Sequence, residues 1–174
     1  MVRSDSFQVA QQLVVTFEPL YADVVVPERA TSGAAGYDVR AHLKERTVEI
    51  MVGTRAEHIV ISEDSLVLQP GVRAAIPLGF RAMLPSVLEA QLRLRSSIAF
   101  RKGLMMPNAP ATVDPDYPGE WVIVLANMLS GPVEIKHLER LAQIVFARFE
   151  KVHWKTGPVI ASSDRGARFG STGQ

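Results

Sequence analysis

Short hydrophobic runs separated by turn-forming residues are the feature that most constrains how this chain can fold. Its 174 residues include 11 prolines and 12 glycines, and these are spread along the whole chain. Proline fixes φ and removes a backbone N–H donor, so long helices and central strands cannot run through these positions. Apolar runs about 8 to 12 residues apart, with turns between them, are typical of sandwiches and barrels. We therefore predict an all-β, jelly-roll-like or distorted β-barrel fold with at most a short helix, whose position the sequence does not give.

The length is enough for one domain with a substantial core but too short for two. Residues 86–95 contain good helix formers, but residues 92–95 alternate apolar and basic side chains, which favours a strand with one buried face. The predicted strands are therefore 13–17, 23–26, 37–41, 47–52, 58–61, 65–68, 71–76, 79–84, a strand within 86–95, 121–125, 133–135 and 141–149.

Composition excludes several classes of protein. The net charge of +1, from 19 basic and 18 acidic residues, argues against a dominant nucleic-acid surface. The absence of cysteine rules out disulfides, thiolate zinc sites and cysteine nucleophiles. No apolar run reaches the ~18–20 residues of a membrane helix, and the first residues lack the apolar core of a signal peptide. We expect a cytoplasmic protein with neither a nucleic-acid nor a membrane partner.

The run from Pro107 to Glu120 concentrates chemically useful side chains in one stiff segment. It holds two carboxylates, a carboxamide and a phenol, together with four prolines that restrict its conformations. Asp114-Pro115 and Tyr117-Pro118-Gly119 are turn signals, and a strand follows directly. Two interpretations remain open: a loop that holds reactive groups on a scaffold, or a proline-rich connection between two strands.

Familiar catalytic and metal-binding motifs are absent. The chain has no phosphate-binding G-x-x-x-x-G-K-[ST] loop, dinucleotide G-x-G-x-x-G, nucleophile elbow G-x-S-x-G or zinc motif H-E-x-x-H. The four histidines, His42, His58, His137 and His153, lack metal-ligand spacing, so we predict that they are ordinary surface or core residues.

Several polar clusters are instead suited to phosphate. Arg95-Ser96-Ser97 places a guanidinium beside two hydroxyls, and Arg140 lies three residues before Gln143. The tail adds Arg165, Arg168 and the run 170–173, with further hydroxyl and N–H donors. Taken alone, Arg95-Ser96-Ser97 is better explained as an exposed strand end, Arg140 and Gln143 fit the polar entry to a strand, and the tail fits a disordered segment. Together they indicate a phosphate cradle with one isolated carboxylate, Asp114, available to activate water.

The order of these clusters resembles the five motifs of the trimeric-type dUTP pyrophosphatase (dUTPase) family. The counterparts are residues 35–41; Arg95-Ser96-Ser97 with 102–104; residues 108–127; residues 139–144; and residues 165–173. The resemblance implies a homotrimer whose active sites draw on all three chains. It also implies hydrolysis of dUTP to dUMP and pyrophosphate, with Mg²⁺ held by the triphosphate rather than directly by protein side chains.

The resemblance also assigns roles to individual residues. Asp114 resembles the carboxylate that activates water for attack on the α-phosphorus, and Tyr117 the phenol that packs under the deoxyribose and excludes a 2′-hydroxyl. Asp38 and Arg140 resemble supporting residues, with Asp38 reaching magnesium only through water. The residues that correspond to uracil contacts are Asn108, Thr112, Val113 and Val122. Those that correspond to phosphate contacts are Arg95, Ser96, Ser97 and Gln143. Those that correspond to the closing lid are Arg165, Arg168, Phe169, Ser171 and Thr172.

Three departures from the family pattern stand out. Ser97 replaces a common glycine, where its side chain either crowds the phosphate or donates a further hydrogen bond. The fifth motif is one residue short between Arg165 and Phe169 and has Arg168 in place of a usual glycine, so Arg168 can share or take over the role of Arg165. Residues 44–64 resemble an inserted hairpin. The resemblance thus implies a domain over residues 1–164 and a flexible lid over 165–174.

Two rival functions follow from the same resemblance. A dCTP deaminase, or a deaminase–dUTPase hybrid, shares the fold and often has R-S-S in the second motif. Its deaminating site needs a glutamate where this chain has Ala126, which disfavours deamination. The other rival is a non-catalytic, dUTP-sensing regulatory trimer, in which residues 44–64 would be the first surface to examine.

Overall fold

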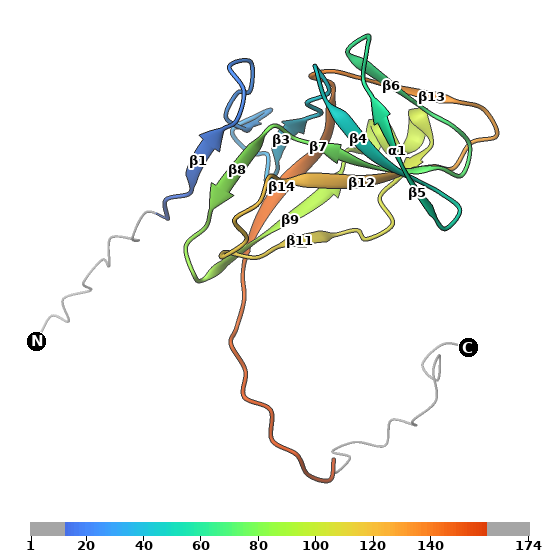
Figure 1. The fold of residues 1–174 in the computed structure, drawn as a ribbon. Helices are drawn as coiled ribbons and strands as arrows, with labels where there is room; N and C mark the ends of the chain where they lie inside the picture. The colour runs from blue at the N-terminus through green and yellow to red at the C-terminus, as the bar shows by residue number, and fades with distance from the viewer. Residues whose placement is uncertain (1–12, 160–174) are drawn as a thin grey trace, which may run out of the picture.

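The computed structural model describes residues 13–159 (Figure 1). The elements in this range are β1 (Thr16–Pro19), β2 (Glu28–Arg29), β3 (Tyr37–Arg40), β4 (Thr47–Val52), β5 (Arg55–Val60), β6 (Ser65–Leu68), β7 (Arg73–Pro77), β8 (Phe80–Met83), β9 (Leu88–Leu94), α1 (Ser96–Lys102), β10 (Leu104–Met105), β11 (Ala111–Val113), β12 (Val122–Asn127), β13 (Val133–Lys136) and β14 (Arg140–Arg148).

The strands form two five-stranded and two two-stranded antiparallel sheets in the described range. The larger sheets have the strand orders β10-β12-β7-β4-β5 and β11-β9-β14-β3-β2, and the smaller ones pair β1 with β8 and β6 with β13. The predicted all-β fold with a short helix is confirmed, although no sheet of the described residues closes into a single barrel.

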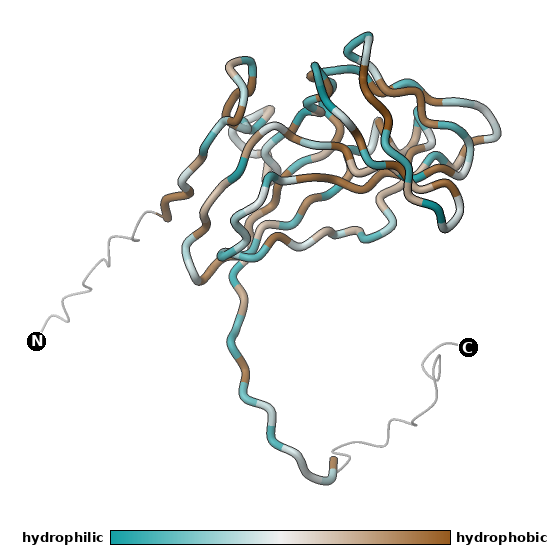
Figure 2. The backbone as a smooth tube through the Cα atoms, in the orientation of Figure 1, coloured by the Kyte–Doolittle hydropathy of each residue, from teal (hydrophilic) through white to brown (hydrophobic). Residues whose placement is uncertain are grey.

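Alternating burial along the strands builds the core. In β9 the buried residues are Leu88, Ala90 and Leu92, with side chains of the intervening residues more exposed, as a strand with one buried face requires. Trp121 is 1% exposed and its ring lies 5.3 Å from that of Phe80. The strand preferred over a helix in residues 86–95 is confirmed by β9. In Figure 2, hydrophobic residues run through the middle of the molecule and hydrophilic residues lie at most outer loops.

The β4–β5 hairpin has one arm inside the core and one at the sheet edge. Val48 and Ile50 of β4 are 1% and 6% exposed, and β4 pairs with β7. β5 pairs only with β4 among the described strands and has no fully buried residue. Deleting residues 44–64 as a unit would therefore remove part of the core as well as a surface hairpin.

Some predicted elements differ from the structure. Residues 23–26 form no strand: Val25 and Val26 are 63% and 59% exposed, because strand propensity without an available partner strand does not create a ladder. The first predicted strand begins only at Thr16, and the short strands β10 and β11 were not expected.

The one helix of the described range, α1, follows β9 directly. It ends at Gly103, which has φ of 60° and closes the helix in the left-handed conformation that glycine adopts readily. No helix in the described range has the length and apolar character needed to cross a membrane.

Candidate functional site

Asp38 joins two arginines that come from distant parts of the sequence. Nη1 of Arg95, at the end of β9, donates to Oδ2 of Asp38 on β3. Nη1 of Arg140, at the start of β14, donates to the same oxygen at 3.3 Å. Two guanidinium groups around one carboxylate leave a net positive charge, which suits an anionic ligand. We call Asp38, Arg95, Arg140 and Gln143 the cationic cluster.

Gln143 reaches this cluster through strand register and a glycine. It lies opposite Asp38 in the pairing of β14 with β3. A Cβ added to Gly36 would lie 2.0 Å from Oε1 of Gln143 and 2.9 Å from its Cβ, so only glycine leaves room for this side chain. The first and fourth sequence motifs are thus coupled by direct packing.

Ser96 and Ser97 are the first two residues of α1, beside Arg95, and both side chains are exposed. Ser97 is not among the non-glycine residues with positive φ in the described range. A glycine at this position is therefore not required by the backbone, and the serine adds a hydroxyl at no conformational cost.

Asp114 and Tyr117 form a tight turn after β11. The N–H of Tyr117 donates to the carbonyl of Asp114 at 3.2 Å, and the phenol donates to the carbonyl of Glu120 at 3.3 Å. A Cβ on Gly119 would lie 2.6 Å from the phenolic oxygen, so the Tyr117 ring covers this glycine closely. Asp114 and Tyr117 are both exposed. The residues predicted to contact uracil lie close to this turn in the sequence, and all are at least partly exposed. They are Asn108 in the loop before β11, Thr112 and Val113 on β11, and Val122 at the start of β12.

Within one chain, the Asp114 turn and the cationic cluster lie near opposite ends of β9. Val113 is paired with Ala90, five residues before Arg95. At roughly 3.3 Å per residue, their Cα positions along β9 are about 16 Å apart, and Asp114 lies further away still. A single chain therefore does not bring Asp114 close to Arg95.

The predicted residues Arg165, Arg168, Phe169, Ser171 and Thr172 lie outside the residues that the structure describes.

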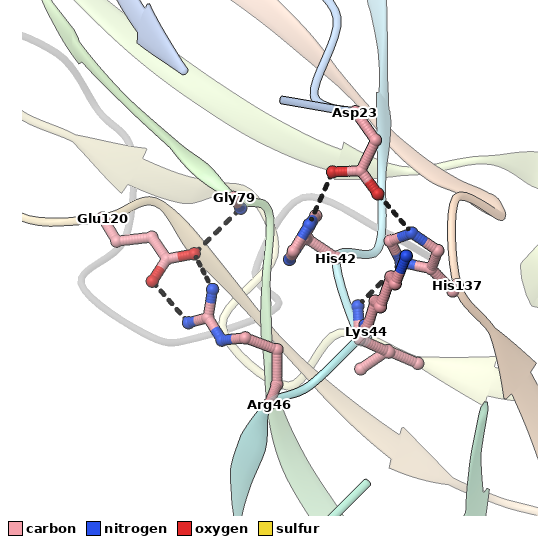
Figure 3. A network of polar contacts seen from close by, with 8 residues as sticks. Asp23, His42, Lys44, Arg46, Gly79, Glu120 and His137 are labelled. Atoms are coloured by element: carbon pink, nitrogen blue, oxygen red, sulfur yellow. Dashed lines mark hydrogen bonds and ion pairs between the residues drawn. The ribbon is translucent and has the colours of Figure 1, made fainter. Parts of the chain in front are cut away.

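Asp23 lies between two histidines (Figure 3). Its Oδ1 is 3.0 Å from Nε2 of His42, and its Oδ2 is 2.9 Å from Nε2 of His137. The ligand atoms of the three residues lie within 4.8 Å of one another, a set that could hold a divalent cation. This group was not predicted from the sequence, because its members are far apart in the chain and no local spacing marks them.

Backbone hydrogen bonding argues against a metal at this group. The N–H of Leu43 donates to Nδ1 of His137 at 3.0 Å, so Nδ1 is an acceptor and the proton of the neutral ring is on Nε2. A protonated Nε2 cannot bind a metal, but it can donate to Asp23. The hydrogen bond from His137, aided by that from His42, holds the pKa of Asp23 below its ordinary value of 3.8, although burial opposes this shift.

A second polar group, also not predicted from the sequence, joins Arg46, Glu120 and Gly79 (Figure 3). The guanidinium of Arg46 donates to both carboxylate oxygens of Glu120, at 3.0 and 2.6 Å. Glu120 also accepts the N–H of Gly79 at 2.9 Å. Burial alone would lower the pKa of Arg46, but the hydrogen bonds and charge of Glu120 outweigh burial and raise it.

Comparison with known proteins gives one consistent family. A family model described as dCTP deaminase-like matches residues 22–149. The chain is 38% identical over 149 residues to a deoxyuridine 5'-triphosphate nucleotidohydrolase of Rhizobium rhizogenes, covering 85% of each chain. It is 35% identical over 151 residues to one of Roseobacter denitrificans, covering 86% of this chain and 88% of that protein. The crystal structure of dUTPase from Streptococcus mutans superposes with a TM-score of 0.62 at 25% identity, over 80% of this chain and 99% of that one.

We predict that Asp23→Asn lowers stability in a pH-dependent way. The folded-state pKa of Asp23 is depressed, so its stabilisation is present above about pH 3.8 and is lost as pH falls through the lower folded value. The amide of the variant can accept from one histidine but not from both. Because Asp23 is 37% exposed, we expect a loss of only about 1 kcal/mol in the free energy of unfolding at pH 7.

Urea unfolding at fixed protein concentration between pH 7 and pH 3 measures this difference, which should shrink towards pH 3. Glu18→Gln is the control, because Glu18 also accepts two hydrogen bonds, from Arg81, but on an exposed surface. A stability difference that stays constant down to pH 3 would contradict the assigned role of the Asp23 carboxylate.

Proposed function

We propose that this chain, which belongs to the dUTPase family, hydrolyses dUTP to dUMP and pyrophosphate through attack of an Asp114-activated water on the α-phosphorus. The observation that carries the proposal is the cationic cluster. Three separate sequence motifs supply its residues. The fold places Arg95, Arg140 and Gln143 around the carboxylate of Asp38. An excess of guanidinium charge with an amide beside it is suited to a polyphosphate.

The cationic cluster would bind and orient the triphosphate. Arg95 and the adjacent hydroxyls of Ser96 and Ser97 contact phosphate oxygens, and Gln143, held in place by Gly36, contacts the α-phosphate. Oδ2 of Asp38 is already shared by two arginines, which fits contact with Mg²⁺ through water rather than direct ligation. Bound with the triphosphate, Mg²⁺ would supply charge neutralisation on the phosphate oxygens.

The turn after β11 would bind the nucleoside and activate water. Asp114 is exposed and takes part in no ion pair within the described residues, so its carboxylate would be accessible to the attacking water. Backbone groups of β11, with Asn108 and Val122, can pair with the uracil edge, and a pocket with fixed donors and acceptors rejects cytosine strongly. Tyr117 would pack under the sugar. The tail residues from Arg165 to Thr172 would close over the bound nucleotide.

The two halves would meet only between copies of the chain. The distance along β9 separates Asp114 from Arg95 in one chain, so a partner must supply the other half, as in a homotrimer. Residues 150–159 support this assembly, because they are exposed throughout and lead away from the domain (Figure 1). Trp154 in this segment is 95% exposed, an unusual position for a tryptophan in a monomer.

Deamination of dCTP is the second candidate, because the matching family model is described as dCTP deaminase-like. The position that would need a glutamate is Ala126, a residue of β12 that is 5% exposed and is paired with Arg73 and Met105. A methyl group there cannot transfer a proton, so we favour hydrolysis over deamination.

A nucleotide panel tests the proposed function. The purified full chain should release pyrophosphate from dUTP with Mg²⁺, and much less from dCTP, dTTP or UTP. Omitting Mg²⁺ should slow hydrolysis of dUTP. Ammonia release from dCTP would favour the deaminase, and absence of any dUTP cleavage with Mg²⁺ would refute the proposed function.

Asp114→Asn should reduce kcat for dUTP by about 10²–10⁴, the usual contribution of a general base, while nucleotide binding persists. The amide has almost the same shape but cannot accept a proton from water. Steady-state hydrolysis and equilibrium binding of dUTP measure the two effects, with Asp116→Asn as the matched control in the same turn. Near-normal turnover of Asp114→Asn would show that another group is the base.

A mixing experiment tests whether the two halves come from different chains. Asp114→Asn and Arg95→Gln should each be nearly inactive alone. When the two variants are co-expressed, random pairing of subunits should restore about a quarter of the wild-type sites, because those sites receive both intact halves. A co-expressed mixture no more active than the separate variants would place both halves in one chain.

A further inference from the structure

The Tyr117 loop, residues 114–120, is fixed at both ends by backbone hydrogen bonds. Before the loop, Thr112 and Val113 pair with β9 through backbone hydrogen bonds. After it, the N–H of Trp121 donates to the carbonyl of Phe80 at 2.9 Å, and the N–H of Leu78 donates to the carbonyl of Trp121 at 3.0 Å. The only charged side-chain anchor of this segment in the described range is Glu120.

Glu120 connects Arg46 to Tyr117. Its carboxylate accepts both arms of the Arg46 guanidinium and its backbone carbonyl accepts the Tyr117 phenol (Figure 3 shows the carboxylate contacts). The Arg46 and Glu120 side chains are 15% and 21% exposed, so water screens the pair weakly. The Tyr117 ring lies against Gly119 and its phenol donates to the Glu120 carbonyl, so the position of residues 119–120 bears directly on that of the ring.

Arg46 is in turn held rigidly. Its carbonyl accepts the N–H of Ile61 at 2.8 Å, which closes the base of the β4–β5 hairpin. Its guanidinium lies 4.9 Å from the centroid of the Tyr21 ring, and Tyr21 stacks on the buried His42 at 4.1 Å. Arg46, which anchors the Tyr117 loop, is therefore held by contacts that lead to the core, and it is not part of a mobile surface arm.

We propose that Arg46, through its two-point contact with Glu120, is a positioning residue that sets the Tyr117 ring and thereby the discrimination between deoxyribose and ribose. This inference rests on the proposed function, in which Tyr117 packs under the sugar. It gives the β4–β5 hairpin a part in substrate selection: the hairpin holds the loop without contacting the nucleotide. A planar fork that binds both carboxylate oxygens fixes orientation as well as distance, and lysine cannot reproduce it.

Two variants test the inference. Arg46→Lys keeps the charge but loses the fork. The double variant Arg46→Met/Glu120→Gln removes both charges, leaves no unpaired buried ion, and keeps an oxygen for the Gly79 N–H. In both, the ratio of kcat/KM for dUTP to that for UTP should fall about tenfold, because a displaced ring admits the 2′-hydroxyl. Arg55→Met, at the exposed far end of the same hairpin, should leave the ratio unchanged.

Hydrogen exchange of the backbone over residues 114–120 supplies a readout that needs no activity. Exchange should be faster in both Arg46 variants than in the wild type and Arg55→Met. If wild-type protein fails to cleave dUTP, the proposed function fails while the exchange result still reports on the anchor. An unchanged dUTP-to-UTP ratio in both Arg46 variants, whatever the change in melting temperature, would overturn the inference and leave Arg46 with a purely structural role.

Discussion

An irregularity in β14 is the constraint on which the cationic cluster depends. Side chains alternate faces along a regular strand, so Arg140 and Gln143, three residues apart, would point to opposite sides of the sheet. The pairing of β14 with β3 shifts register between Arg140 and Ala142. The extra residue turns the Arg140 side chain to the same face of the sheet as Gln143. Arg140 then contacts Asp38, and Gln143 lies opposite the same aspartate. Without this shift, one of the two side chains would point away from Asp38.

This geometry also explains why β14 lies between β3 and β9. Its two neighbours supply Asp38 and Arg95, and the backbone N–H of Arg95 donates to the carbonyl of Leu141 at 3.0 Å. Three segments far apart in sequence thus meet through backbone ladders, which are insensitive to side-chain substitution. The side chains of these segments therefore lie close enough to contact one another directly. The absence of a side chain at Gly36 leaves the space that Gln143 occupies. The cationic cluster is rigid because its scaffold is the middle of a sheet.

How much the sequence reveals depends on whether a signal is local. The alternation in residues 92–95 and the turn residues between apolar runs fix most strands, because period and turn chemistry are properties of neighbouring residues. The Val24–Val26 run misleads for the opposite reason: its propensity is real, but no strand is available to pair with it. The short β11 escapes prediction because its three residues carry too little pattern.

The candidate site shows the same division. Arginines, hydroxyls and Asp114 were identified by residue type and motif order, and the fold brings Asp38, Arg95, Arg140 and Gln143 together as that order implies. The contact between Arg46 and Glu120 and the grouping of Asp23 with His42 and His137 leave no trace in local sequence. Their members are tens of residues apart, and only the packed structure makes them neighbours.

The length of β9 has a consequence that no side-chain change can remove. Arg95 is at one end of this strand, and β11, which leads into the Asp114 turn, pairs near the other. The spacing is set by backbone rise, so a longer or more flexible side chain cannot close about 16 Å. A reaction that needs both groups at one phosphorus must therefore take them from different copies. If Asp114 and Arg95 act on one phosphorus, as proposed, an oligomer is a requirement of that geometry, and weakening its interfaces would remove activity even where every proposed site residue remains intact.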